Sequence, residues 1–145
     1  MSKKKEKSVQ SIEIPKIILF IAKFLSVFSS KLTTLFVAKL FTTPIKHKIP
    51  KREHAMEHES AQKTITISEI NKEIVVYEYG KSDKKILLVH GWSGRGTQLV
   101  KIADELLKNG FMTISFDAPA HGKSKGNSSI MIEFIASIFE LEKQF

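Results

Sequence analysis

A run of four consecutive apolar residues, Ile86–Val89, most constrains the fold of this 145-residue chain. A strand that is apolar on both faces is typical of a parallel sheet covered by helices on both sides. This strand runs into the tight turn His90-Gly-Trp92, and the next strand runs into the compact loop Asp117–Ser124. Because functional crevices in open α/β sheets form outside the carboxyl ends of the strands, both motifs are expected at one site.

The sequence around this strand alternates strand and helix patterns. A hairpin of two half-buried strands is predicted at 64–68 and 74–79, and a further strand at 111–116. Helices are predicted at 97–109, ending at Gly110, and after the capping residues 127–129, where Met131, Phe134, Ile135, Ile138 and Phe139 form an apolar stripe. The predicted fold class is therefore α/β, with an antiparallel hairpin followed by parallel βαβ strands.

The two strand-end motifs resemble the front half of the α/β-hydrolase fold, over about Thr64 to Phe145. In that family the first turn supplies a backbone donor for the oxyanion hole, the group of N–H donors that binds negative charge on a carbonyl oxygen. The resemblance implies that the N–H of Trp92 is this donor and that His90 and Gly91 form the turn. We expect His90 itself to be a strand-end histidine held by hydrogen bonds rather than a catalytic base.

The second motif is similar to the D-x-x-G-x-G-x-S loop of the same family. Asp117, Gly122 and Ser124 match this pattern, whereas Ala120 stands where the first glycine is usual, which implies a slightly different turn. The family gives this loop a structural role at the border of the pocket. Asp117, His121 and Ser124 share one short loop, so they are not expected to form a catalytic triad, which needs residues from separate elements.

The one match to Gly-x-Ser-x-Gly, Gly122–Gly126, belongs to this second loop, and the separate strand–turn–helix elbow that carries the family's serine nucleophile does not occur in the 145 residues. The resemblance therefore implies an N-terminal fragment of a serine-type, esterase-like hydrolase that acts on ester or related acyl substrates and is inactive alone. No cofactor is expected. The family's sheet order also predicts that Ile86–Val89 is an exposed apolar edge strand, which favours aggregation.

The charge of the chain lies in its N-terminal part. Residues 1–63 carry 13 Lys/Arg and 5 Asp/Glu, whereas residues 64–145 carry 10 of each. Four segments are predicted: a disordered basic start at 1–14, an amphipathic helical segment at 15–41, a polar linker at 42–63 and the partial hydrolase domain at 64–145. A neutral globular part argues against nucleic-acid binding.

The helical segment allows several interpretations. Its apolar stripe consists of Ile17, Ile21, Leu25, Phe28, Leu32 and Leu35. Lys23 interrupts the apolar run, which argues against a membrane span and a signal peptide. An amphipathic helix on an anionic membrane surface, through residues 3–41, and a helix docked on protein both remain. A non-enzymatic chain that acts through this arm is the alternative function. The absence of cysteine fits a cytoplasmic location, with a peripheral position at the membrane left open.

The linker contains the motif His54-Ala-Met-Glu57-His58, which matches the H-x-x-E-H pattern of zinc proteases. Such a site needs a buried helix and a third ligand. Because its neighbours are almost all polar, we expect a solvated helix and no metal site.

Overall fold

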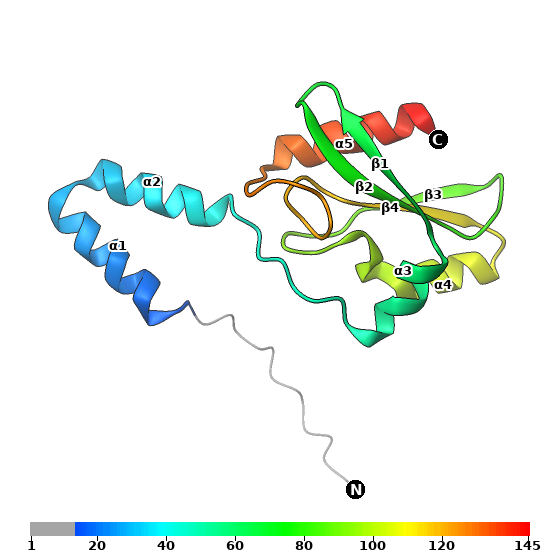
Figure 1. Cartoon of the computed structure of the whole chain (residues 1–145), viewed down its shortest axis with the longest axis horizontal. Helices are drawn as coiled ribbons and strands as arrows, with labels where there is room; N and C mark the ends of the chain where they lie inside the picture. Colours follow the sequence, from blue (N-terminus) through cyan, green and yellow to red (C-terminus); the bar gives the residue numbers. More distant parts are fainter. Residues whose placement is uncertain (1–13) are drawn as a thin grey trace, which may run out of the picture. The chain divides into compact units, whose positions relative to one another are not determined.

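A computed structural model of the chain describes residues 14–145 (Figure 1). The predicted disordered basic start therefore lies outside the described residues, except for Ile14. The chain divides into two compact units, residues 1–38 and 39–145. The boundary of the hydrolase-like domain expected at residue 64 remains a prediction.

The larger unit is built on one sheet of four strands, which runs in the order β1, β2, β4, β3 (Figure 1). These strands are β1 (Ala61–Ile67), β2 (Lys72–Tyr79), β3 (Lys85–Leu88) and β4 (Met112–Asp117). β2 is antiparallel to both β1 and β4, whereas β3 is parallel to β4. The predicted α/β class, with an antiparallel hairpin followed by a parallel pair, is confirmed.

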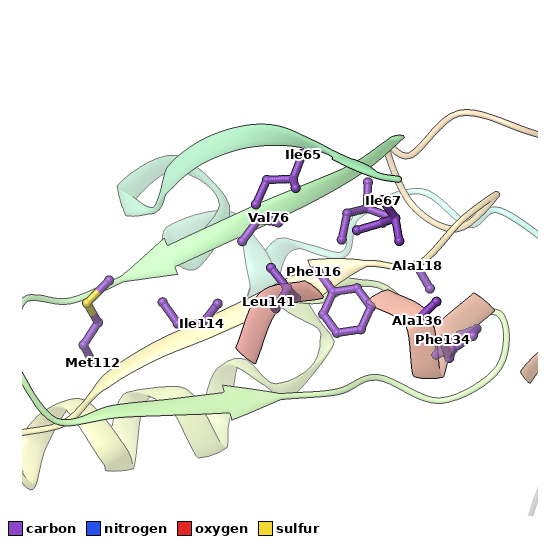
Figure 2. Packing of buried hydrophobic residues seen from close by; sticks show 11 residues of the cluster. Ile65, Ile67, Val76, Met112, Ile114, Phe116, Ala118, Phe134, Ala136 and Leu141 are labelled. Atoms are coloured by element: carbon purple, nitrogen blue, oxygen red, sulfur yellow. The ribbon is translucent and has the colours of Figure 1, made fainter. Parts of the chain in front are cut away.

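Helices and two apolar clusters cover the two faces of this sheet. The predicted helix at 97–109 consists of the 3₁₀ turn η2 (Gly96–Leu99) and α4 (Val100–Lys108), and α5 (Met131–Gln144) follows β4. Figure 2 shows the larger cluster, in which Phe134, Ala136 and Leu141 of α5 meet strand residues such as Val76 and Phe116. The smaller cluster contains Met56, Tyr79, Leu88, Val100 and Ala103.

β3 is an edge strand of the sheet, as the sequence predicts. Ile86 and Leu87 are half-buried because each packs against a different apolar cluster. One side of this strand has no neighbouring strand among residues 14–145, so its peptide groups on that side are open to pairing.

The apolar stripe predicted for the last helix is only partly buried. Phe134 is buried and Ile138 half-buried, but Met131, Ile135 and Phe139 are 72%, 43% and 54% exposed. The residues that α5 buries instead include Ala136, Ser137 and Leu141. No element among the described residues covers the remaining apolar side of this helix. The predicted helix is confirmed, and part of its stripe stays exposed because α5 is apolar around more than half of its circumference.

The N-terminal helical segment forms two helices, α1 (Lys16–Phe28) and α2 (Ser30–Phe41). Ser29 between them has an extended backbone, with φ −164° and ψ 121°, which ends α1. Neither helix contains a buried residue. Within residues 14–145, no helix combines the length and the apolar character of a membrane span.

The segment 42–63, predicted to be a polar linker, is part of the larger unit and packs onto the rest of it at several points. It contains the 3₁₀ turn η1 (Lys51–Glu53) and α3 (His54–Glu59). Met56 is fully buried in the smaller apolar cluster. Glu53 is 1% exposed, accepts a hydrogen bond from the Thr97 hydroxyl at 2.8 Å and lies 3.7 Å from Arg95 Nε. The sequence argument missed this attachment because it depends on polar contacts between residues far apart in the chain and on a single buried apolar residue, which no local pattern records.

Candidate functional site

The turn after β3 presents a backbone donor that has no partner. Gly91 O accepts a hydrogen bond from Gly94 N–H at 3.0 Å and closes the turn. The N–H of Trp92, inside this turn, donates no hydrogen bond to any of the residues 14–145. A group able to bind a developing negative charge needs such a free donor, so the position of Trp92 fits the role that the sequence implies.

The conformational strain in this turn falls on Ser93 and not on glycine. Ser93 has φ 55°, in the left-handed region, whereas a Cβ added at Gly91 would meet no atom within 4 Å. The position in this turn that has no room for a side chain is Gly94, where a Cβ would lie 2.8 Å from Gly91 O. Ser93 is also tied down, because its hydroxyl accepts a hydrogen bond from the N–H of Ile45 at 3.0 Å.

An apolar cavity of about 530 Å³ adjoins this turn. Its walls come from the end of α2, the turn after β3 and the first half of α5: Phe41, Thr42, Val89, His90, Gly91, Trp92, Ser129, Ile130, Met131, Phe134, Ile135 and Ile138. The Trp92 ring is 48% exposed and stacks on Phe41, with ring centroids 6.2 Å apart. The cavity therefore offers hydrocarbon contacts beside the turn that carries the N–H of Trp92.

His90 joins the two strand-end motifs. Its Nε2 accepts a hydrogen bond from the N–H of Ala118 at 3.1 Å, and its Nδ1 lies 2.7 Å from Gly91 O. Because Nε2 accepts, the ring is neutral and carries its proton on Nδ1. Burial lowers the pKa of His90 below the ordinary value of 6.5, which keeps this form at neutral pH. The geometry gives His90 a bridging role between backbone groups.

His121 packs beside His90 in an aromatic cluster. Its ring centroid is 5.1 Å from those of His90, Trp92 and Phe134. His121 Nδ1 donates to Pro119 O at 2.9 Å, and Nε2 has no partner among the described residues. Burial lowers the pKa of His121 as well. Two neutral histidines thus lie under the turn that carries Trp92.

Asp117 organises the second motif from a fully buried position. Its Oδ2 accepts hydrogen bonds from the Tyr77 hydroxyl at 2.9 Å and the Lys123 N–H at 2.7 Å. Its Oδ1 accepts one from the N–H of Gly96 at 2.6 Å. Burial and the adjacent Asp117 raise the pKa of Tyr77, so its hydroxyl stays a donor. A carboxylate with three donors is the expected way to bury such a charge.

Two residues of the second loop have a left-handed backbone. Ala120 has φ 63° and Gly122 has φ 44°, so both adopt the left-handed conformation. Ala120 therefore holds a backbone conformation that a glycine would adopt without strain. At Gly122 there is no room for a side chain, because a Cβ would lie 2.2 Å from Asp117 Oδ2.

Ser124 is buried and doubly hydrogen-bonded. Its hydroxyl donates to Asp117 O at 2.5 Å and accepts from the N–H of Val75 at 2.9 Å. It thereby fastens the loop to β2. Both hydrogen bonds are to backbone groups, so the serine has no histidine or other general base as its partner.

The H-x-x-E-H motif does not gather its side chains around a common point. His54 and His58 are exposed, with ring centroids 6.2 Å apart, and Glu57 forms an ion pair with Lys123 at 2.5 Å. This ion pair lowers the pKa of Glu57. Among residues 14–145 no group of three or more His, Cys, Asp or Glu side chains is placed to hold a metal ion.

Sequence reasoning missed three residues of the site: Phe41, Tyr77 and Gly96. Phe41 lies in the arm, and nothing in its spacing points to the turn after β3. For Tyr77 the sequence indicated only a place in a predicted strand, and not a contact with Asp117. Gly96 packs on the Tyr77 ring, where a Cβ would lie 2.6 Å from the ring, and its N–H reaches Asp117. The pair Gly94 and Gly96 was the available signal for a close backbone approach.

Comparison with models of protein families gives no match, and comparison with curated protein sequences gives none. Solved structures do match. An esterase from Pyrococcus furiosus is 23% identical over 71% of this chain and 40% of its own, with a TM-score of 0.57. An esterase from Exiguobacterium antarcticum is 22% identical over 58% and 31%, with a TM-score of 0.52. A bromoperoxidase from Bacillus anthracis is 23% identical over 58% and 31%, with a TM-score of 0.51.

The larger unit therefore has the α/β-hydrolase fold, in the part that holds the first strands of the sheet. The chain spans less than half the length of the solved proteins that it matches. Most of these neighbours are hydrolases, including esterases, a thioesterase domain and an epoxide hydrolase.

We predict that Asp117→Ala destabilises the chain much more than Tyr77→Phe. The alanine leaves the Gly96 N–H, the Lys123 N–H and the Tyr77 hydroxyl buried without an acceptor, at a cost of at least about 3 kcal/mol. Tyr77→Phe removes one donor and costs about 1–2 kcal/mol. Urea unfolding followed by circular dichroism measures both, and equal losses would contradict the central role of the carboxylate.

A second pair of substitutions tests the loop backbone. Gly122→Ala should destabilise the chain by several kcal/mol, because its Cβ collides with the buried carboxylate. Ala120→Gly removes the backbone strain of an alanine in the left-handed conformation, but it also raises the chain entropy of the unfolded state. The free energy of unfolding should therefore change by less than about 1 kcal/mol. Thermal melts compare the two, and a tolerated Gly122→Ala would refute the steric argument.

The buried histidines predict a loss of stability in mild acid. Their pKa values are lowered in the folded state, so below pH 6.5 the unfolded chain binds protons that the folded chain does not. Stability is then complete above about pH 6.5 and falls by up to about 1.4 kcal/mol per pH unit for each histidine. Melting temperatures between about pH 7.5 and about pH 5 measure this effect.

His121→Phe provides the control for that experiment. The phenyl ring can occupy the place of the imidazole beside Trp92 and Phe134, and it does not titrate. The pH dependence should therefore weaken, whereas replacing the exposed His54 should leave it unchanged. A melting temperature that stays constant or rises toward acid would contradict the prediction.

Proposed function

We propose that this chain supplies the oxyanion-hole turn and part of the acyl pocket of a serine-type hydrolase that acts on esters or related acyl substrates. The observation that carries the proposal is the free N–H of Trp92 at the carboxyl end of β3. Esterases are among the solved structures that share this fold. Acyl-transfer chemistry of that kind needs hydrogen-bond donors directed at the carbonyl oxygen.

The environment of this donor suits an acyl substrate. The cavity beside Trp92 is lined mostly by apolar side chains, so it favours a hydrocarbon chain over a charged or sugar-like group. Exclusion of water strengthens a hydrogen bond to a developing oxyanion. The neutral, hydrogen-bonded His90 holds the turn in place without bringing a positive charge into the cavity.

We further propose that the 145 residues do not turn over substrate by themselves. The one Gly-x-Ser-x-Gly match, Gly122–Gly126, lies in the second motif, and its serine, Ser124, is 1% exposed with both hydrogen bonds to backbone groups. An acyl-transfer nucleophile needs an adjacent base and access to the substrate. The chain therefore contributes binding and one donor, and the nucleophile has to come from elsewhere.

Two measurements test the catalytic part of this proposal. The purified chain should neither release 4-nitrophenol from 4-nitrophenyl esters nor react with a fluorophosphonate probe; labelling of a serine would show a nucleophile that the proposal denies. The coding sequence after codon 145 should contain an in-frame Gly-x-Ser-x-Gly soon after a strand pattern. A native stop at that point would remove the hydrolase assignment.

The acyl pocket can be tested without catalysis, because Trp92 is the one tryptophan of the sequence and lines the cavity. Titration with decanoate should shift its fluorescence to shorter wavelength and saturate, whereas acetate should have no such effect. Ile135→Gln should weaken binding by roughly tenfold or more, since it places an amide in an apolar cavity. Ile102→Gln on α4, outside the cavity, is the matched control. Equal effects of both variants would refute the pocket.

A further inference from the structure

The described residues of the smaller unit, 14–38, leave nearly all of their large apolar side chains in the open. Ten are at least 47% exposed: Ile14, Ile17, Leu19, Phe20, Phe24, Val27, Phe28, Leu32, Leu35 and Val37. The residues on the other side, including Ile18, Ile21 and Leu25, are half-buried. The two helices thus pack one apolar face within the smaller unit and leave a second apolar face exposed.

The second face of α1 is continuous along the helix. Ile17, Phe20, Phe24, Val27 and Phe28 follow one another at spacings of three or four, so they share one side. The rings of Phe24 and Phe28 lie 4.9 Å apart on this side. Their exposed fractions range from 56% to 81%. Exposed apolar patches of this kind mark a surface that binds something.

The charges beside this face are of one sign. Lys16, Lys23 and Lys31 lie in the described unit, which contains no Asp or Glu between residues 14 and 38. On a helical projection, with 100° per residue, Lys16 and Lys23 border the exposed stripe next to Phe20 and Val27. Long lysine side chains in this position can reach away from an apolar layer while their stems remain in it. The sequence before residue 14 adds Lys3, Lys4, Lys5 and Lys7.

We propose that residues 14–38 bind the surface of an anionic lipid bilayer, with the exposed face of α1 inserted at the boundary between headgroups and acyl chains. An apolar face flanked by lysines is the pattern of helices that lie in the plane of a membrane interface. The lysines, unopposed by any acid in residues 14–38, match the negative potential of anionic lipids. This binding is independent of the proposed hydrolase chemistry.

The experiment is vesicle flotation with the whole chain, because aggregated protein sediments whereas vesicle-bound protein floats. We expect flotation with vesicles that contain about 30% phosphatidylserine in phosphatidylcholine, and little with phosphatidylcholine alone. Binding should decrease when salt rises from about 50 mM to about 500 mM, because salt screens the charge attraction. Equal recovery with both lipids, or no recovery with either, would overturn the proposal.

Two sets of variants locate the binding surface. Lys16→Gln/Lys23→Gln/Lys31→Gln should weaken partitioning to the anionic vesicles, by about fivefold for each lysine. The matched control is Lys101→Gln/Lys108→Gln/Lys143→Gln, which removes the same charge from exposed positions in the larger unit. If the control weakens binding as much, the chain binds through its total charge and the proposal fails.

The apolar contribution is tested with Phe20→Ser/Phe24→Ser, compared with Ile102→Ser, which lies on the exposed side of α4. The double variant should lose binding to anionic vesicles by at least tenfold, with unchanged melting of the larger unit. Retained binding, or loss with Ile102→Ser, would show that the helix does not insert. Light scattering without lipid tests whether a second copy of the chain covers the exposed face of α1 instead. Stable oligomers that vesicles do not dissociate would overturn the proposal.

Discussion

The buried carboxylate of Asp117 is the constraint on which the rest of the site depends. It accepts hydrogen bonds from Tyr77 of β2, Gly96 at the start of η2 and Lys123 of the loop after β4, so one charged group fixes three separate segments. The requirement for room around it explains Gly122. Removing the charge would leave three buried donors without an acceptor, and such groups cost more than the hydrogen bonds contribute.

The turn that carries Trp92 depends on the same loop through His90. His90 accepts from the N–H of Ala118, directly after β4, and donates to Gly91 O in the turn after β3. The two strand-end motifs are therefore one structure, in which the second supports the first. His90 thereby holds the turn in which the N–H of Trp92 has no hydrogen-bond partner among residues 14–145.

Both units leave apolar surface exposed, and the two surfaces differ in the charged residues that lie beside them. In the larger unit, exposed apolar residues of α5 such as Met131 and Ile135 line the cavity, and β3 has no neighbouring strand on one side among residues 14–145, as expected for a surface that packs against further protein or an acyl chain. Between residues 14 and 38 of the smaller unit, exposed apolar side chains lie beside lysines, and no Asp or Glu occurs. The two surfaces therefore call for different partners, the first uncharged and the second anionic.

The sequence by itself determined the fold class and the order of strands and helices along the chain, because hydrophobic periodicity and glycine turns are local signals. The edge position of β3 was predicted from the resemblance to the α/β-hydrolase family. It also identified both strand-end motifs through the resemblance. Only the tertiary structure decided the partners of Asp117, the burial of Glu53 and Met56, the contact of Phe41 with Trp92 and the exposure of Met131 and Phe139. These depend on contacts between residues far apart in the chain, and no local pattern records which polar group or apolar face finds a partner.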